Sequence, residues 1–312
     1  AGVSGAVDTL LREFEAAAKL KLRVYDMASG SDAALMERLR ASGPLMPHDE
    51  GLYSLRAVKL YADGALGSRG AALMAPYEDA SGKGLLFHSD AELLAQMRPL
   101  AKAGFQISVH AIGDAANRQV LNAFETLKRE QGVKSSNERH RIEHAQVIAL
   151  NDIPRFAKLQ VIASVQPTHA TSDMNMAEDR VGHERIQGAY AWQTLLKSGA
   201  RLACGSDFPV EEPTPWAGLY AAITRQDAAG KPPGGWYGQQ ALSPVQALAC
   251  FTRWAAYASH RENELGALLP GYRADFILVD RDPLASLPTT LLKVKVLQTW
   301  VGGRQVYGAP NE

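Results

Sequence analysis

The sequence predicts an α/β fold in which a mainly parallel sheet is followed by a small β unit. Two observations support this prediction. Short apolar runs alternate with amphipathic helical segments through most of the 312 residues, and strands that alternate with helices form parallel sheets. Near the C-terminus, the runs 274–279 and 294–307 indicate strands of a separate β unit, the second with a turn at Gly302-Gly303.

Six strands are expected in the α/β part. Each is a short, mostly apolar run, and the runs span residues 22–25, 57–61, 105–109, 139–143, 160–165 and 200–204. A closed (β/α)8 barrel needs eight strands. The count of six therefore leaves such a barrel incomplete.

Capping signals mark two of the expected helices. Ser89 and Glu92 form a capping box at the start of the segment 89–103, and Ser243 with Gln246 forms a second one. Further helices are expected over residues 114–129 and 185–197.

Composition excludes several classes of protein. The chain has 33 basic and 33 acidic residues, a balance that argues against nucleic acid or an anionic membrane as partner. No run of 18 apolar residues predicts a membrane-spanning helix. The two cysteines, Cys204 and Cys250, form neither a disulfide framework nor a Cys-rich zinc module, and they are compatible with the cytoplasmic location that we expect.

Polar residues stand where the predicted strands end, and this shared position favours a site. A buried lysine such as Lys59 needs a partner or a lowered pKa. Taken singly, His110 or Asp207 would more often be a structural hydrogen-bonding group or a cap. In a barrel, the carboxyl ends of the strands carry the active site, and histidines with a lysine and an aspartate suit a metal there. The residues at this edge are Lys59, Asp63, His110, His144, Gln166, His169 and Asp207.

A second interpretation concerns the segment His140–His144. Its sequence fits H-x-x-E-H, a zinc-peptidase signature. That signature needs a helix, so a strand at residues 139–144 would exclude it.

Six segments in order carry a resemblance to a known family. They are Val58–Ser68, Val109–Asp114, Arg141–Gln146, Gln166–Asp173, Gly205–Val210 and Pro270–Asp275. With them the chain resembles the amidohydrolase superfamily, specifically the amidohydrolase 3 group that is similar to N-substituted formamide deformylases.

The resemblance implies the fold and a metal site. Residues 1–265 would form part of a (β/α)8 TIM-type metallo-dependent hydrolase barrel, and residues 266–312 part of a β-sandwich. His169 and Asp173 would face the substrate. The implied metal ligands are Lys59 (as a carboxylated lysine), His110, His144 and Asp207.

The resemblance also implies a reaction. A divalent metal, by default zinc, would activate water to hydrolyse a carbon–nitrogen bond, not a peptide bond, in a small-molecule amide. Asp207 would take a proton from that water and pass it to the leaving amine.

One family feature is missing. No two of the eight histidines form a His-x-His pair, which the family carries on its first strand. The chain is therefore expected to be a C-terminal portion with strands 3 to 8, to hold at most one metal, and to self-associate or require an N-terminal complementing segment. The alternative is a catalytically silent fragment with an association role.

Overall fold

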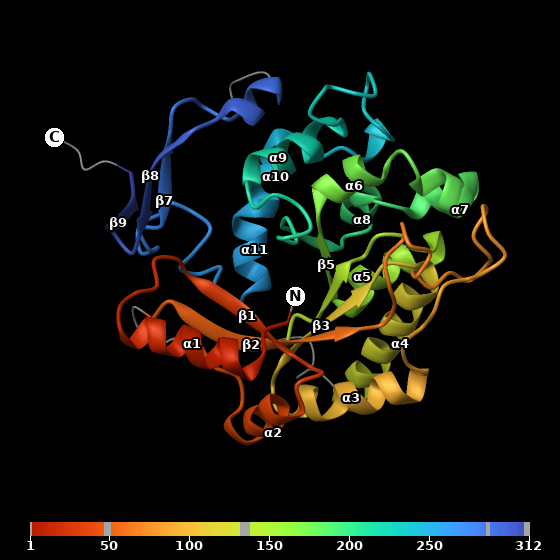
Figure 1. The fold of residues 1–312 in the computed structure, drawn as a ribbon, viewed down its shortest axis with the longest axis horizontal. Helices are drawn as coiled ribbons and strands as arrows, with labels where there is room; N and C mark the ends of the chain where they lie inside the picture. The colour runs from red at the N-terminus through yellow and green to blue at the C-terminus, as the bar shows by residue number, and fades with distance from the viewer. Residues whose placement is uncertain (1, 47–50, 132–137, 285–287, 309–312) are drawn as a thin grey trace.

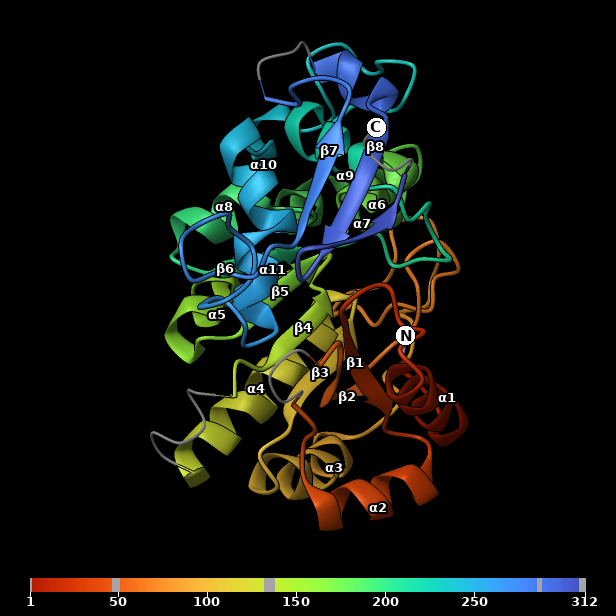
Figure 2. The same ribbon diagram turned by 90° about the vertical axis from the view of Figure 1, so that its left-hand side faces the viewer.

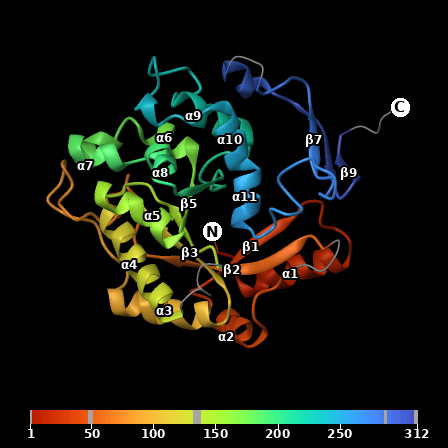
Figure 3. The ribbon, with the colours of Figure 1, turned by 180° about the vertical axis from the view of Figure 1, so that it is seen from behind.

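The computed structural model describes residues 2–46, 51–131, 138–284 and 288–308. It contains a six-stranded sheet in the body of the molecule and a three-stranded sheet beside it (Figure 1). The small sheet, built from the C-terminal residues, lies apart from the large one in all three views of the ribbon (Figures 1, 2 and 3).

The large sheet is entirely parallel, and its strands follow one another in chain order from β1 to β6. This sequential order, with helices between the strands, is the arrangement of an incomplete α/β barrel and confirms the predicted fold class. The strands are β1 (Val24–Ser29), β2 (Tyr53–Tyr61), β3 (Gln106–Ala111), β4 (Arg141–His144), β5 (Ile162–Val165) and β6 (Arg201–Cys204).

The small sheet is antiparallel. It consists of β7 (Phe276–Val279), β8 (Val296–Val301) and β9 (Arg304–Tyr307), which pair in this order. Gly302 and Gly303 join β8 to β9, at the turn that the sequence predicted.

Helices cover one face of the large sheet. Figure 2 shows α3, α4 and α5 following the strands along this side. The capping boxes at Ser89 and Ser243 are both formed. The α-helices are α1 (Gly5–Ala16), α2 (Ala33–Ser42), α3 (Asp90–Lys102), α4 (Asp114–Gln131), α5 (Ile153–Leu159), α6 (Pro167–Asp173), α7 (Ala177–Arg185), α8 (Trp192–Lys197), α9 (Pro215–Thr224), α10 (Pro244–Phe251) and α11 (Arg253–Ala258).

The opposite, inner face of the sheet is polar. A cavity of ≈ 270 Å³ lies along it, and Tyr25, Lys59 and Ser164 are among its lining residues. Arg141 and Glu143, two residues apart on β4, also face this cavity and form an ion pair of 3.0 Å. Side chains alternate between the faces of a strand, so the apolar residues between these polar ones belong to the core under the helices.

Two expectations need correction. The predicted helix 185–197 is interrupted: a short 3₁₀ turn, Ile186–Gly188, is followed by extended backbone before α8 starts. Cys204 and Cys250 are joined by a disulfide, which links the end of β6 to α10. Their separation of 46 residues gave no local signal of this pairing. Within the described ranges, no helix is both long and apolar enough to cross a membrane.

Candidate metal centre

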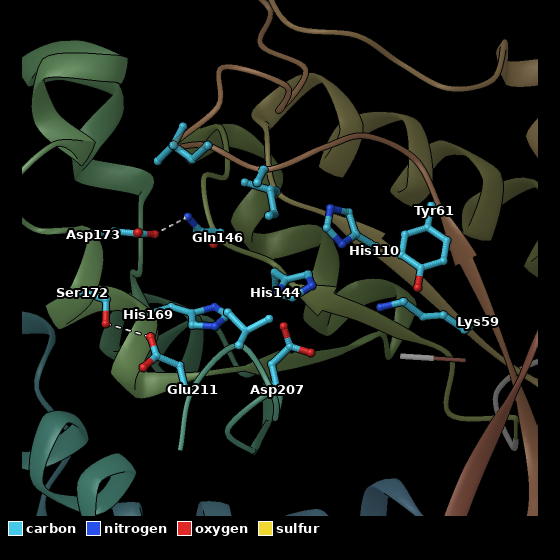
Figure 4. A pocket seen from close by; sticks show the side chains of 15 residues that line it. Lys59, Tyr61, His110, His144, Gln146, His169, Ser172, Asp173, Asp207 and Glu211 are labelled. Atoms are coloured by element: carbon cyan, nitrogen blue, oxygen red, sulfur yellow. Dashed lines mark hydrogen bonds between the residues drawn. The ribbon is translucent and has the colours of Figure 1, made fainter. Parts of the chain in front are cut away.

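A cavity of ≈ 470 Å³ opens at the carboxyl ends of the strands. Its lining includes the six site residues that the family resemblance implied: Lys59, His110, His144, His169, Asp173 and Asp207. Asp63 and Gln166, which the sequence also placed at this edge, are not part of the lining. Figure 4 shows these side chains around one space, with Lys59 and His110 on one side and Asp173 on the other. The parallel register explains the convergence, because β2, β3 and β4 end at the same edge.

Lys59 lies near the end of β2, 4% exposed. Burial lowers the pKa of its amine, and the nearby carboxylates of Glu143 and Asp207 oppose this effect. The amine stands 5.0 Å from the centre of the Tyr61 ring. A buried lysine was expected to have a lowered pKa or a charged partner, and Lys59 has both.

His110 and His144 end the neighbouring strands β3 and β4, and their ring centres are 4.5 Å apart. Burial lowers the pKa of His110 to about 4 and that of His144 well below its usual value. Both imidazoles are therefore neutral at pH 7, the form that binds metals.

The tautomer of His144 follows from its partner. Its Nδ1 is 2.9 Å from Oε1 of Gln166, an acceptor, so Nδ1 carries the proton and Nε2 presents its lone pair. A hydrogen bond of this kind on the far nitrogen orients a metal-binding histidine. Gln166, which the sequence placed at the edge of the sheet, therefore acts through His144.

Asp207 lies three residues beyond the end of β6, with a left-handed backbone (φ 59°). The left-handed region suits Asp better than most residues with a Cβ atom. Its carboxylate lines both the large cavity and the polar inner cavity, as Lys59 does.

The side chains around the cavity are of the kinds that bind a metal ion. Two neutral imidazoles, a carboxylate and a lysine amine of lowered pKa are hard or borderline ligands of the kind that zinc, iron and manganese accept. Among the residues that the structure describes, no three His, Cys, Asp or Glu side chains already surround one ion position. Lys59, His110, His144 and Asp207 are therefore candidate ligands rather than an assembled metal site.

His169 and Asp173 come from α6, on the other side of the cavity. The His169 ring stacks on that of His144, with centres 5.8 Å apart. Oδ2 of Asp173 accepts hydrogen bonds from Tyr190 (2.6 Å) and from Gln146 (3.0 Å). Tyr190 lies inside the segment 185–197, where the sequence favoured a surface role for it over contact with substrate, but the structure buries it. Gln146 is only two residues from His144.

Asp63 is a structural residue. Its buried carboxylate accepts three backbone N–H groups, from Ala72, Ile112 and Gly113. These bonds fix the loops after β2 and β3, and burial raises the pKa of Asp63 to about 7. It does not line the cavity.

The peptidase interpretation is wrong. Residues Arg141–His144 form a strand, so the H-x-x-E-H segment lacks the helix that places both histidines on one ion. His140 instead stacks on Phe124 under the sheet, and its Nδ1 accepts a hydrogen bond from the Ile107 N–H.

An incomplete α/β barrel with a cavity at the carboxyl ends of its strands is the arrangement in which barrel enzymes carry their active sites. The model of the amidohydrolase family matches residues 7–307. The chain belongs to this family, as its motifs indicated.

Relatives agree with this assignment. YtcJ of Bacillus subtilis (strain 168) is 35% identical over 253 residues, which are 80% of this chain and 47% of YtcJ. N-substituted formamide deformylase of Arthrobacter pascens is 26% identical over 303 residues, 94% of this chain and 54% of the deformylase. The chain thus spans about half the length of the curated relatives it matches.

A solved structure shares the fold. An uncharacterized metal-dependent hydrolase from Pyrococcus horikoshii OT3 superposes with a TM-score of 0.80 at 32% identity, covering 92% of this chain and 56% of that one. This likeness confirms the fold.

Proposed function

We propose that the chain carries the main part of an active site that hydrolyses a non-peptide carbon–nitrogen bond in a small-molecule amide. Zinc is the proposed metal, with Lys59, His110, His144 and Asp207 as its ligands. The observation that carries the proposal is a pair of neutral histidines, His144 buried and His110 partly exposed, beside a lysine of lowered pKa.

The metal, when bound, lowers the pKa of water and polarises a carbonyl group. Nε2 of His144, whose Nδ1 is held by Gln166, would be the nitrogen that binds the metal. The uncharged amine of Lys59 is the form that reacts with carbon dioxide to give an anionic carbamate, and the proton released goes to solvent. Asp207 accepts the proton of the attacking water on its carboxylate and delivers it to the nitrogen of the leaving amine.

The relatives guide the choice of substrates. Because one of them is an N-substituted formamide deformylase, N-substituted formamides are the first compounds to test. We also propose that activity requires a complementing segment or a second copy, since the sequence has no His-x-His pair. The other candidate, a catalytically silent association domain, predicts no turnover with either addition.

Metal content tests the proposal. The parent chain, His110→Ala and His183→Ala are exposed to zinc and bicarbonate, freed of excess metal and measured by elemental mass spectrometry. His183 is the matched control, because its side chain is 83% exposed and is not among the residues that line the cavity. We expect about one zinc in the parent and in the control, and none in His110→Ala. Equal zinc in all three proteins, or none in any, would overturn the proposal.

A further inference from the structure

A second cavity adjoins the candidate metal centre. It has a volume of ≈ 350 Å³ and shares two lining residues, Ser172 and Glu211, with the first cavity. The Ser172 hydroxyl donates a 2.7 Å hydrogen bond to Glu211 Oε1, and Figure 4 shows this bond at the edge of the first cavity. The two cavities are therefore separated by one pair of side chains. A ligand that crosses this pair occupies both.

The lining of the second cavity is polar and acidic. It includes the carboxylates of Glu211 and Asp227 with the neutral polar side chains of Asn175 and Gln226, and none of its described residues is Lys or Arg. Asp227 is held in place, because its Oδ1 accepts the backbone N–H groups of Ala229 and Lys231. Neither of these two bonds uses Oδ2.

Two polar atoms at the boundary lack partners. Thr168 lines the second cavity and His169, the next residue of α6, lines the first. Within the described part of the chain, the buried atoms Thr168 Oγ1 and His169 Nε2 make no hydrogen bond. A buried polar group without a partner costs free energy until a ligand or a water satisfies it. One of these two unpartnered atoms belongs to a residue that lines each cavity.

A further carboxyl group, that of Asp173, lines the first cavity. It lies close enough to Glu211 for that carboxylate to add to the rise in its pKa that burial causes. The lysine of the first cavity, Lys59, lies on the opposite side, as Figure 4 shows. The wall around α6 therefore presents carboxylates without a cation among the lining residues, which favours a positively charged ligand group.

We propose that the second cavity binds a protonated amine at the far end of the substrate, whose amide lies in the first cavity. The substrate class is then an N-acylated diamine or a similar amide with a distal cationic nitrogen. This inference rests on the proposed hydrolysis for the position of the amide, but the charge preference follows from Glu211 and Asp227 alone.

Two matched probes test the inference by calorimetry. N-formyl-1,5-diaminopentane carries the distal ammonium group, and N-formylpentylamine has the same formamide and chain without it. We expect the amine probe to bind the parent chain about tenfold more tightly, the effect of a pair of partly buried ionic contacts. In the double variant with Glu211→Gln and Asp227→Asn, this preference should fall to about twofold or less. Gln and Asn keep the acceptor oxygens that hold Ser172 and the 227–231 turn, so unfolding temperatures should match the parent.

Glu212→Gln is the control variant, because Glu212 is exposed and lines neither cavity. It should retain the full preference. Equal affinity of the two probes for the parent, absence of binding at millimolar concentration, or a preference that survives the double variant would overturn the inference. These outcomes differ from failure of the proposed function, which appears as missing zinc; the probe preference is measured without metal, in the parent and in His110→Ala.

Discussion

Burial sets the charge of the residues around the large cavity. Lys59, His110 and His144 are ordinary bases in water, but each loses affinity for its proton where the protein withdraws it from solvent. Their neutral forms are the ones that bind metal or form a carbamate. The same burial that makes the sheet stable thus prepares the site for chemistry.

His140 provides a test of this effect away from the candidate ligands. Burial lowers its pKa to about 3, whereas an unfolded histidine titrates near 6.5. The unfolded chain therefore binds the proton first, and stability is full above about pH 6.5 and is lost as the pH falls toward 3, by at most about 1.4 kcal/mol per pH unit for this residue.

We expect His140→Asn, whose amide oxygen can accept the Ile107 N–H, to flatten the pH dependence of stability. Urea unfolding at pH 7 and pH 5.5 measures the free energy of unfolding at each pH. The average slope between these pH values should decrease by about 0.6 proton relative to the parent, and His183→Asn should leave it unchanged. An unchanged slope in His140→Asn would mean that this histidine is not buried as described.

The candidate metal ligands could be predicted from the sequence, but the side chains that hold the neighbouring site residues in place could not. Lys59 was identifiable because a lysine in an apolar strand is exceptional. The hydrogen bonds of Asp173 to Tyr190 and Gln146 join segments that are far apart in the chain. No local pattern reports such a contact, and the same holds for Glu211.

At the scale of elements, the alternation of strands and helices was predictable from apolar periodicity, and the capping boxes located helix starts. The prediction of one continuous helix over 185–197 was wrong because tertiary contacts interrupt it. Gly188 packs so tightly that a Cβ atom there would lie 1.9 Å from the carbonyl oxygen of Ile148. The backbone at Ala189 pairs with Val147 as an isolated β-bridge instead of continuing a helix. The apolar periodicity of the sequence carries no information on such a contact between distant segments.

The two outer strands of the large sheet differ. Val3 bridges the free side of β1 at Ala28. In the described part of the chain, β6 pairs only with β5, so its other edge lacks a strand. Unpaired backbone groups at an edge favour pairing with another chain.

We propose that the β6 edge drives association of the isolated chain. Light scattering over a dilution series should give a mass above that of one chain, falling as the protein is diluted. A monodisperse monomer at every concentration would contradict this proposal. Addition of a complementing N-terminal segment should reduce the association, because it occupies the same edge.

At the scale of the whole molecule, the parallel sheet and its register bring residues from four strand ends to one cavity. This arrangement follows from the fold, which sequence motifs predicted through family resemblance and which the match over residues 7–307 confirms. The disulfide between β6 and α10 and the second cavity are properties of the assembled molecule, and neither was foreseeable from spacing.

The most direct test of the account is to locate the metal. Crystals of the chain grown with zinc would be measured with X-rays on both sides of the zinc absorption edge. We expect one anomalous peak in the large cavity, about 2.1 Å from ring nitrogens of His110 and His144, with Lys59 and Asp207 around it. A peak at surface histidines such as His183 with none in the cavity would contradict the proposed metal centre.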